Sequence, residues 1–526
     1  MISKLMRPVL CSCVSVIAVG FQSASATDKT DATSDSVILN AATFPYVRTM
    51  DDRFQSFQIG MSHLTGGETW KAYSEGDDHS KQAANFEAVR QARAPTDLSN
   101  RRLRNLAKGL GPFYVRYGGT TSNSVYFQDD DGPRLDRPPE GFRTILTRKS
   151  WAAAVDFAKA IDAKITTGFT VSIGVRDTNG AWTPRHAAPW LAYTKSIGGE
   201  IYAAELFNEP NAHEPGWTDE PESAAGFARD FNVLSQFLEQ AAPNLKLAGP
   251  GVARLGVPFP VPSLEKVTAE QYFTASPRPI FDIVSYHFYG AMAERCAPPE
   301  SPAGISANDA LTEAWLARPD ATFQAQKALR DAHAPGAPIW LTETGAAACG
   351  GTRWQPTFLD SFRFLDTQGR LAKQGLDVIV THALISGSNG VIDEKTFLPN
   401  ANYWSALLWR RHIGDRVLDA GPITPGLHLY AHCQRGVAGG VTVLAINLRE
   451  SSAAINVGGA AELYALTAPE LQSRTVLLNG QALALDANDQ LPTLTAKKPS
   501  RGPVTLAPTS INFIAMPKAN NPACKI

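Results

Sequence analysis

Short apolar runs alternate with helix-like segments along most of this chain, from about Phe57 to Trp404. Eight of the runs are β-branched or apolar and have the length of strands: Phe57–Met61, Phe113–Tyr117, Ile165–Val171, Ile201–Phe207, Lys246–Ala248, Ile283–Tyr286, Ile339–Leu341 and Val378–His382. Eight successive strand–helix units predict the α/β class and a (β/α)8 barrel over residues 50–413. An open doubly wound sheet is the alternative, but no Gly-x-Gly-x-x-Gly follows the first strand.

Two of the helix-like segments carry boundary signals. Ser223 is expected to cap a helix whose apolar stripe begins at Phe227. Another helix is expected to run from near Phe358 to near Gly375, because a glycine there can end it.

The pattern changes after about Gly414, where short strand-like runs follow one another. They are Leu427–Cys433, Val441–Leu448, Glu462–Leu466, Thr475–Leu478, Ala482–Leu485 and Ile511–Met516. Asn479-Gly480 is typical of a tight hairpin turn. We predict a β-sandwich over residues 414–526, with residues 27–49 contributing a strand to it.

Residues 1–26 are expected to be a signal peptide. Lys4 and Arg7 precede an apolar stretch that is too short to span a bilayer, and Ala24-Ser25-Ala26 fits a cleavage site. No other stretch could cross a membrane. The mature protein is therefore expected to be secreted or periplasmic.

Four cysteines remain after this segment, namely Cys296, Cys349, Cys433 and Cys524. An even number in an exported chain favours two disulfides, with buried free thiols as the alternative. The spacing suggests the pairs Cys433–Cys524 and Cys296–Cys349. The first bridge would close a loop of about 90 residues and stabilise the small domain by about 4–5 kcal/mol.

The charge and the motif content exclude several kinds of partner. The formal net charge of −1 gives no overall attraction for nucleic acid or anionic membranes. There is no Cys-x-x-Cys, no His-Glu-x-x-His and no cluster of histidines, so we expect no metal and no cofactor. We expect a monomer.

Two carboxylates end predicted barrel strands. Asn208 and Glu209 follow the fourth strand, which Pro210 ends by removing a backbone donor. Glu343 follows the seventh strand. The active sites of barrel enzymes lie at the carboxyl ends of the barrel strands. Two carboxylates at one rim can lie about 5–5.5 Å apart, which is the separation that retaining glycoside hydrolysis needs.

The chain resembles glycoside hydrolase family 79, the family of the heparanases, which belongs to the clan A of retaining glycosidases. The motifs that carry the resemblance span nearly the whole chain after the first segment: Val115–Thr120, Glu205–Asn211, Trp340–Thr344, Tyr403-Trp404, Tyr430–Cys433, Ala445–Leu448 and Leu478–Gly480.

The resemblance implies roles for individual residues. Glu209 would be the acid/base and Glu343 the nucleophile. Asn208 would bind the sugar hydroxyl next to the anomeric carbon, and Tyr289 would hold the nucleophile. Thr120, in a glycine turn, and Arg176, after the third strand, are further substrate-binding candidates, and Gly350 and Gly351 would bind a uronate carboxylate through their backbone amides. Arg254, in the loop after the fifth strand, is also expected to bind substrate, although heparanases have an amide side chain near that position.

Besides Arg254, two further positions depart from the family pattern. The stretch Ser388-Asn389-Gly390 lacks a tyrosine that heparanases use on the uronate carboxylate. His63 stands where the family usually has an acidic residue. These differences bear on subsite preference and leave the type of reaction unchanged.

The residues and the resemblance together predict a retaining endo-β-D-glucuronidase. Its expected partner is a glucuronic-acid-containing polysaccharide, heparan sulfate or a related glycosaminoglycan. The alternatives are an exo-β-glucuronidase that removes terminal glucuronic acid, and a carbohydrate-binding protein on a catalytically dead barrel. The presence of both Glu209 and Glu343 argues against the last of these.

Overall fold

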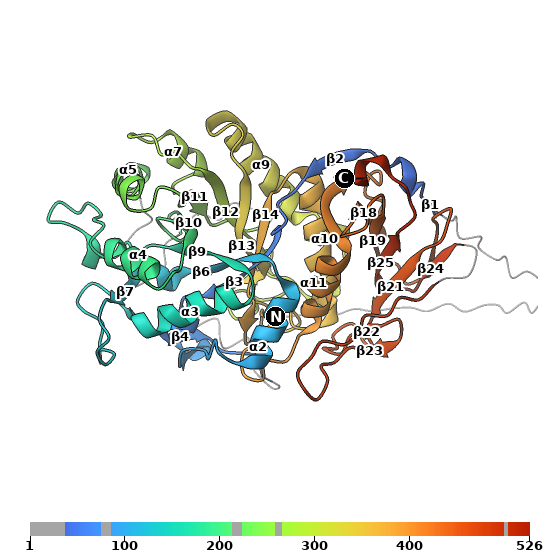
Figure 1. Ribbon diagram of the computed structural model, residues 1–526, viewed down its shortest axis with the longest axis horizontal. Coiled ribbons are helices and arrows are strands. Elements are labelled where there is room, and N and C mark those ends of the chain that lie inside the picture. Colours follow the sequence, from blue (N-terminus) through green and yellow to red (C-terminus); the bar gives the residue numbers. More distant parts are fainter. Residues whose placement is uncertain (1–36, 75–85, 213–222, 258–265, 499–502, 526) are drawn as a thin grey trace, which may run out of the picture. The chain divides into compact units, whose positions relative to one another are not determined.

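The computed structural model describes residues 37–74, 86–212, 223–257, 266–498 and 503–525 (Figure 1). The predicted signal peptide lies outside the described residues. Within the ranges given, no helix has the length and apolar character needed to cross a membrane.

Eight parallel strands close a barrel, which confirms the predicted fold class. In chain order they are β3 (Gln55–Gly60), β6 (Phe113–Gly118), β9 (Ala163–Gly168), β10 (Ile201–Glu205), β11 (Lys246–Val252), β12 (Ile283–Met292), β13 (Ile339–Ala348) and β14 (Val378–His382). Strand β14 pairs with β3, and Val380 lies opposite Ser56. All eight predicted strands are found. Strands β12 and β13 run further than predicted and stay paired as far as Met292 and Ala348.

Helices connect the barrel strands. The longer ones are α2 (Arg101–Leu110), α3 (Arg148–Ala160), α4 (Ala187–Ser196), α5 (Ala224–Ala241), α9 (Arg318–His333), α10 (Phe358–Gln374) and α11 (Ala401–His412); the short ones are α1 (Ser62–Thr65), α7 (Ala269–Thr274) and α8 (Glu313–Leu316). Ser223 caps α5 by accepting a hydrogen bond from the Gly226 amide at 3.0 Å. Gly375 ends α10 with a φ of 119°, so both predicted boundaries are confirmed.

The barrel interior changes from apolar to polar along the strands. A buried cluster fills one level: Tyr114, Ala203, Ala248, Ile283, Trp340, Val378 and Val380. Since every second residue of a strand faces the same side, the residues two positions further along also point inward. On four strands these are polar and buried: Arg116, Glu205, Ser285 and Thr342. Gln58 of β3, which lies opposite Arg116, is also polar and buried. The apolar level supports a polar level above it.

Two β-sheets follow the barrel. One has the order β2 (Tyr46–Thr49), β17 (Ile413–Leu418), β18 (Leu427–Gln434), β19 (Val441–Asn447), β25 (Ser510–Met516), β21 (Glu462–Thr467), β22 (Leu477–Leu478) and β23 (Gln481–Ala482). The other is β1 (Val37–Ile38), β20 (Ala453–Asn456) and β24 (Val504–Leu506). Val443 and Ile514 of the first sheet share a hydrophobic core with Ile455 of the second. The segment before the barrel contributes two strands, β1 and β2, rather than one.

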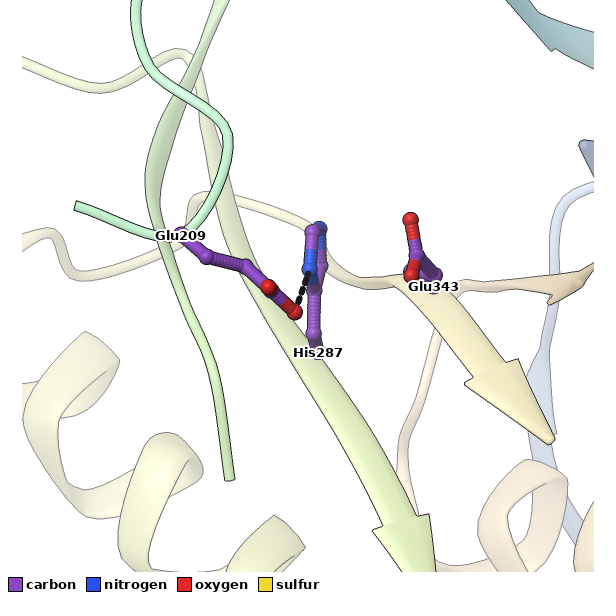
Figure 2. A group of neighbouring side chains, drawn as sticks. All are labelled: Glu209, His287 and Glu343. Atoms are coloured by element: carbon purple, nitrogen blue, oxygen red, sulfur yellow. Dashed lines mark hydrogen bonds and ion pairs between the residues drawn. The ribbon is translucent and has the colours of Figure 1, made fainter. Parts of the chain in front are cut away.

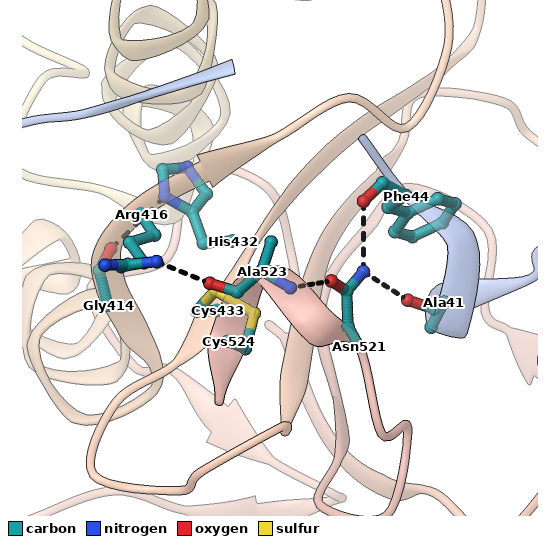
Figure 3. Close-up of a disulfide and its surroundings, with 9 residues drawn as sticks. All are labelled: Ala41, Phe44, Gly414, Arg416, His432, Cys433, Asn521, Ala523 and Cys524. Carbon is teal, nitrogen blue, oxygen red and sulfur yellow. Dashed lines mark hydrogen bonds between the residues drawn. A yellow bond between two sulfur atoms is a disulfide. The ribbon is translucent and has the colours of Figure 1, made fainter. Parts of the chain in front are cut away.

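The disulfide Cys433–Cys524 ties the end of the chain to β18 (Figure 3). Beside it, the Asn521 side-chain amide donates hydrogen bonds to the carbonyl oxygens of Ala41 at 2.8 Å and Phe44 at 3.0 Å. The bridge and the amide together fasten both ends of the described chain onto the sheets.

A buried charge network joins α10 of the barrel to β18. The His428 imidazole, fully buried, lies 2.5 Å from Asp366 through Nδ1 and 2.9 Å from Glu313 through Nε2. Tyr430 Oη donates to the same Asp366 oxygen at 2.5 Å, and Arg370 pairs with Asp366 at 3.1 Å. Burial alone would lower the pKa of His428, but the hydrogen bond and charge of Asp366, together with Glu313, raise it above its usual value.

This network predicts how stability changes with pH. A histidine whose pKa is raised by folding stabilises the fold fully below its unfolded pKa of about 6.5, and loses that contribution as the pH rises through the folded value. The contribution of His428 should therefore fall as the pH rises from 5 to 8, opposite in sign to the contributions of His63, His412 and His432, whose pKa values burial lowers. In thermal unfolding, His428→Gln should remove this contribution and lower stability by about 3–5 kcal/mol at low pH, as expected when one partner of a buried pair is removed, and its deficit relative to wild type should shrink as the pH rises. The control His333→Gln should keep the wild-type dependence on pH; an unchanged dependence in His428→Gln would contradict the assignment.

Candidate active site

Glu209 and Glu343 approach each other at one end of the barrel. Glu209 follows β10, and Glu343 lies in β13. One oxygen of each carboxylate and a ring nitrogen of His287 lie within 4.8 Å of one another, and His287 stands between the two carboxylates in Figure 2. This separation is close to the one expected for retaining glycosidases and well short of the roughly 6.5–9.5 Å of inverting ones.

Arg116 is the buried cation at the centre of this region. Its guanidinium donates to Glu343 Oε2 at 2.7 Å and to Glu205 Oε2 at 2.8 Å, and it also bonds Asn208 Oδ1 at 2.9 Å and Gln58 Oε1. Only 2% of the residue is exposed. A buried charge is tolerated when it is paired, and Arg116 is paired twice. Arg116 therefore links Glu343, the predicted nucleophile, to Asn208, which precedes Glu209, the predicted acid.

Glu343 is held as a carboxylate. Tyr289 Oη donates to Glu343 Oε1 at 2.6 Å, while Arg116 occupies the other oxygen. Burial alone would raise the pKa of Glu343, but the neighbouring His382, His287 and Arg116 side chains hold it well below its usual range. Burial and the neighbouring Glu343 raise the pKa of Tyr289, so the phenol keeps its proton. Glu343 is thus ionised and oriented from two sides.

Glu209 has a different partner. Its Oε1 lies 2.9 Å from His287 Nδ1, and His287 Nε2 lies 3.3 Å from Arg116 Nη2. Because a guanidinium can only donate, Nε2 is the acceptor and the proton sits on Nδ1, which donates to Glu209. The side chain of Glu209 is 16% exposed, compared with 8% for Glu343. Glu209 is therefore the more accessible of the two carboxylates.

The segment that carries Asn208 and Glu209 is fixed by Asn123. The backbone N–H of Asn208 donates to Asn123 Oδ1 at 2.9 Å, and Asn123 Nδ2 donates back to the backbone carbonyl of Asn208 at 3.0 Å. Glu209 itself has a φ of 56°, a conformation that a non-glycine residue rarely adopts without support. The paired bonds hold the turn that aims this side chain.

The predicted carboxylate-binding glycines lie after β13. The disulfide Cys296–Cys349 joins the loops that follow β12 and β13, as predicted, and immediately precedes Gly350. A Cβ on Gly350 would come within 2.6 Å of the Trp70 ring, and one on Gly351 within 2.6 Å of Gln355 Oε1. No side chain fits at either glycine without displacing a neighbour.

The other predicted substrate-binding residues differ in how they are placed. Thr120 begins a 3-10 turn directly after Gly119, whose φ is 92°. The carbonyl of Arg254 accepts from the Tyr289 amide at 3.0 Å, so its backbone lies beside the site. The Arg176 guanidinium instead forms an ion pair with Asp230 of α5 at 2.6 Å. Arg176 is thus held to a helix on the outside of the barrel.

The departures from the family pattern at His63 and Asn389 have structural partners. His63 is buried and lies 2.8 Å from Thr96 Oγ1 and 3.0 Å from Arg93 Nη1, which pairs with Glu394 at 2.9 Å. Burial and the charges of Arg93 and His382 hold the pKa of His63 well below its usual value, so it is neutral. Asn389 Nδ2 donates to the carbonyl of His382 at 3.2 Å.

Four residues of the site were not given roles by the sequence: Arg116, Glu205, His287 and His382. Their signal was present, since each is a polar residue in an otherwise apolar strand. Polarity at an inward position shows that a buried partner is needed but not which residue supplies it. The partners come from different strands and meet only across the closed barrel.

Glu209, His287 and Glu343 also have the spacing of a metal site. The donor set fits a cation poorly, because Arg116 and Tyr289 already donate to the two oxygens of Glu343. His287 directs an N–H, not a lone pair, toward Glu209. The arrangement fits two carboxylates that are each held by hydrogen bonds from neighbouring side chains. The absence of a metal stays a prediction.

A closed (β/α)8 barrel with two carboxylates at one end is the arrangement that retaining glycoside hydrolases use. Residues 88–369 match the model of "Glycosyl hydrolase family 79, N-terminal domain". The chain belongs to glycosyl hydrolase family 79.

Curated relatives are similar over most of their length. Heparanase-like protein 1 of Arabidopsis thaliana is 28% identical, over 81% of this chain and 86% of that protein. The hyaluronoglucuronidase of Hirudo nipponia is 27% identical, over 82% and 92%. Mouse heparanase is 26% identical, over 82% and 88%. Among solved structures, the α-L-arabinofuranosidase of Thermotoga petrophila matches with a TM-score of 0.61 at 14% identity, over 91% of this chain and 99% of that one, which shows the same fold.

Proposed function

We propose that the protein is a retaining endo-β-D-glucuronidase that cleaves internal glucuronic acid linkages in heparan sulfate or a related glycosaminoglycan. The observation that carries the retaining chemistry is the approach of Glu209 and Glu343 to within 4.8 Å. The substrate class is supported by the relatives, two of which are named for heparan and hyaluronan glucuronide cleavage.

In the first step, one oxygen of Glu343 attacks the anomeric carbon while Glu209 gives a proton to the leaving oxygen. A glycosyl ester forms and the chain beyond the cut departs as an alcohol. Arg116 and Tyr289 fix the plane of the attacking carboxylate before the sugar arrives. Asn208, held by Asn123, is placed to bond the adjacent sugar hydroxyl.

In the second step, Glu209 acts as a base. It takes a proton from water, which attacks the anomeric carbon and releases Glu343. Two displacements return the original β configuration. His287 contacts Glu209 in both steps. Its Nδ1–H donates to the Glu209 carboxylate and orients that group.

Recognition of the uronate would come from the loop after β13. Gly350 and Gly351 can present backbone amides, and the Cys296–Cys349 bridge fastens this loop. Arg254 and Thr120 are proposed to contact neighbouring sugars, and Arg176 to contribute only if its pair with Asp230 opens. Export through the N-terminal segment is compatible with two disulfides.

The endo assignment predicts the size distribution of products. Digestion of heparan sulfate should reduce the average chain length early, with little free glucuronic acid, when followed by size-exclusion chromatography. An endo enzyme lowers polymer length with each cut, whereas an exo enzyme removes one residue at a time. Steady release of monosaccharide with an almost unmoved polymer peak, together with fast hydrolysis of a simple aryl glucuronide, would instead assign exo cleavage. Glu343→Gln serves as the inactive control.

A further inference from the structure

His382, the last residue of β14, contacts the site but has no role in the two steps above. Its Nδ1 lies 2.7 Å from Tyr289 Oη and 3.4 Å from Glu343 Oε1. Its side chain is 26% exposed, compared with 8% for Glu343. A histidine this close to the predicted nucleophile determines which hydrogen bonds that carboxylate can receive.

The direction of these bonds follows from proton counting. Tyr289 has one hydroxyl proton, and Glu343 Oε1, 2.6 Å away, belongs to an ionised carboxylate that can only accept. Tyr289 therefore donates to Glu343. Its oxygen is then free to accept, so the contact with His382 requires a proton on Nδ1. The result is a chain in which His382 donates to Tyr289 and Tyr289 donates to Glu343.

We propose that His382 is a positioning residue that keeps the Tyr289 proton directed at Glu343. The inference rests on the proposed function, because it takes Glu343 as the nucleophile. An imidazole with an unprotonated Nδ1 would compete for the phenol proton and would turn it away from Glu343. With Nδ1–H in place, Tyr289 pins one oxygen and Arg116 pins the other.

The surroundings of His382 favour the protonated Nδ1. The titratable groups that face it are Tyr289 on β12, Glu343 on β13 and His63 on α1. Tyr289 and His63 are neutral, so Glu343 supplies the charge on this side of the ring. A negative charge 3.4 Å away stabilises an N–H pointing toward it.

Three variants test the chain with heparan sulfate as the substrate, measured by the release of new reducing ends. His382→Leu removes the donor and should lower kcat about 10–100-fold while changing KM less than about threefold, since a misaligned nucleophile affects the reacting state more than binding. His382→Gln keeps an amide N–H and should return kcat to within about fivefold of wild type. His333→Leu, on α9, is the matched control and should behave as wild type.

The pathway through Tyr289 is tested by a double-mutant cycle. If His382 acts through Tyr289, then His382→Leu should have little further effect on kcat in a Tyr289→Phe background. Additive losses, or a Leu variant with wild-type kcat, would overturn the inference. A Gln variant as slow as the Leu variant would also overturn it. If wild type itself does not cleave heparan sulfate or a related glycosaminoglycan while it is folded, the proposed function fails and not this inference.

Discussion

Glu343→Gln should lower kcat on the order of 10⁴-fold while the unfolding temperature stays close to that of wild type. The amide has the shape of the carboxylate but cannot attack the anomeric carbon, and it no longer carries the charge that Arg116 and Tyr289 orient. Arg116 retains Glu205 as a partner at 2.8 Å, so the buried cation remains paired and the barrel should remain folded.

The measurement is the rate at which heparan sulfate digestion releases new reducing ends, with a thermal melt on the same sample. Glu239→Gln, an exposed change of the same type on α5, is the matched control and should keep the wild-type rate. A Glu343→Gln enzyme that is folded and retains more than about one hundredth of wild-type turnover would mean that another group is the nucleophile.

Glu209→Ala should have effects that depend on the leaving group. Cleavage of the polysaccharide, whose leaving alcohol needs a proton, should fall by about 10²–10⁴-fold. A dinitrophenyl glycoside of an oligosaccharide that ends in glucuronic acid needs little acid assistance, so its first step should stay fast and the glycosyl enzyme should accumulate. The side chain is accessible and bonded to His287, which suits a group that must meet both leaving oxygen and water.

Azide separates the acid/base from a binding role in this variant. It needs no deprotonation and fits the space vacated by the side chain, so it should raise turnover of the dinitrophenyl substrate at least about tenfold and give the β-glucuronyl azide. Absence of rescue, or an α-configured azide, would exchange the roles of Glu209 and Glu343 or remove Glu209 from the chemistry.

The barrel strands and both carboxylates could be predicted because their signals are local. An apolar run that ends in Glu209 or Glu343 can be recognised within a few residues of sequence. The long continuation of β13 to Ala348 could not, because it depends on pairing with β12 beyond the barrel. Short strands such as β20 and β24 carry too few residues to show a period.

The partners within the site could be predicted less well. Arg116 contacts Glu343 and Glu205, which are far from it in sequence and come from other barrel strands. Arg176, a cation near a barrel strand, was predicted to bind substrate, and the sequence did not indicate its ion pair with Asp230 of α5. The sequence gives the type of side chain, whereas the closed barrel determines which charge it meets.

The central claim is that Glu343 is the covalent nucleophile of a retaining glucuronidase. A fluorinated or epoxide β-glucuronide inactivator should add its mass to one peptide of the wild-type enzyme, and fragmentation should place the label on Glu343, while the Glu343→Gln enzyme should take up none. A label on Glu209, or a folded and active enzyme that forms no covalent adduct and inverts the anomeric configuration, would contradict this account.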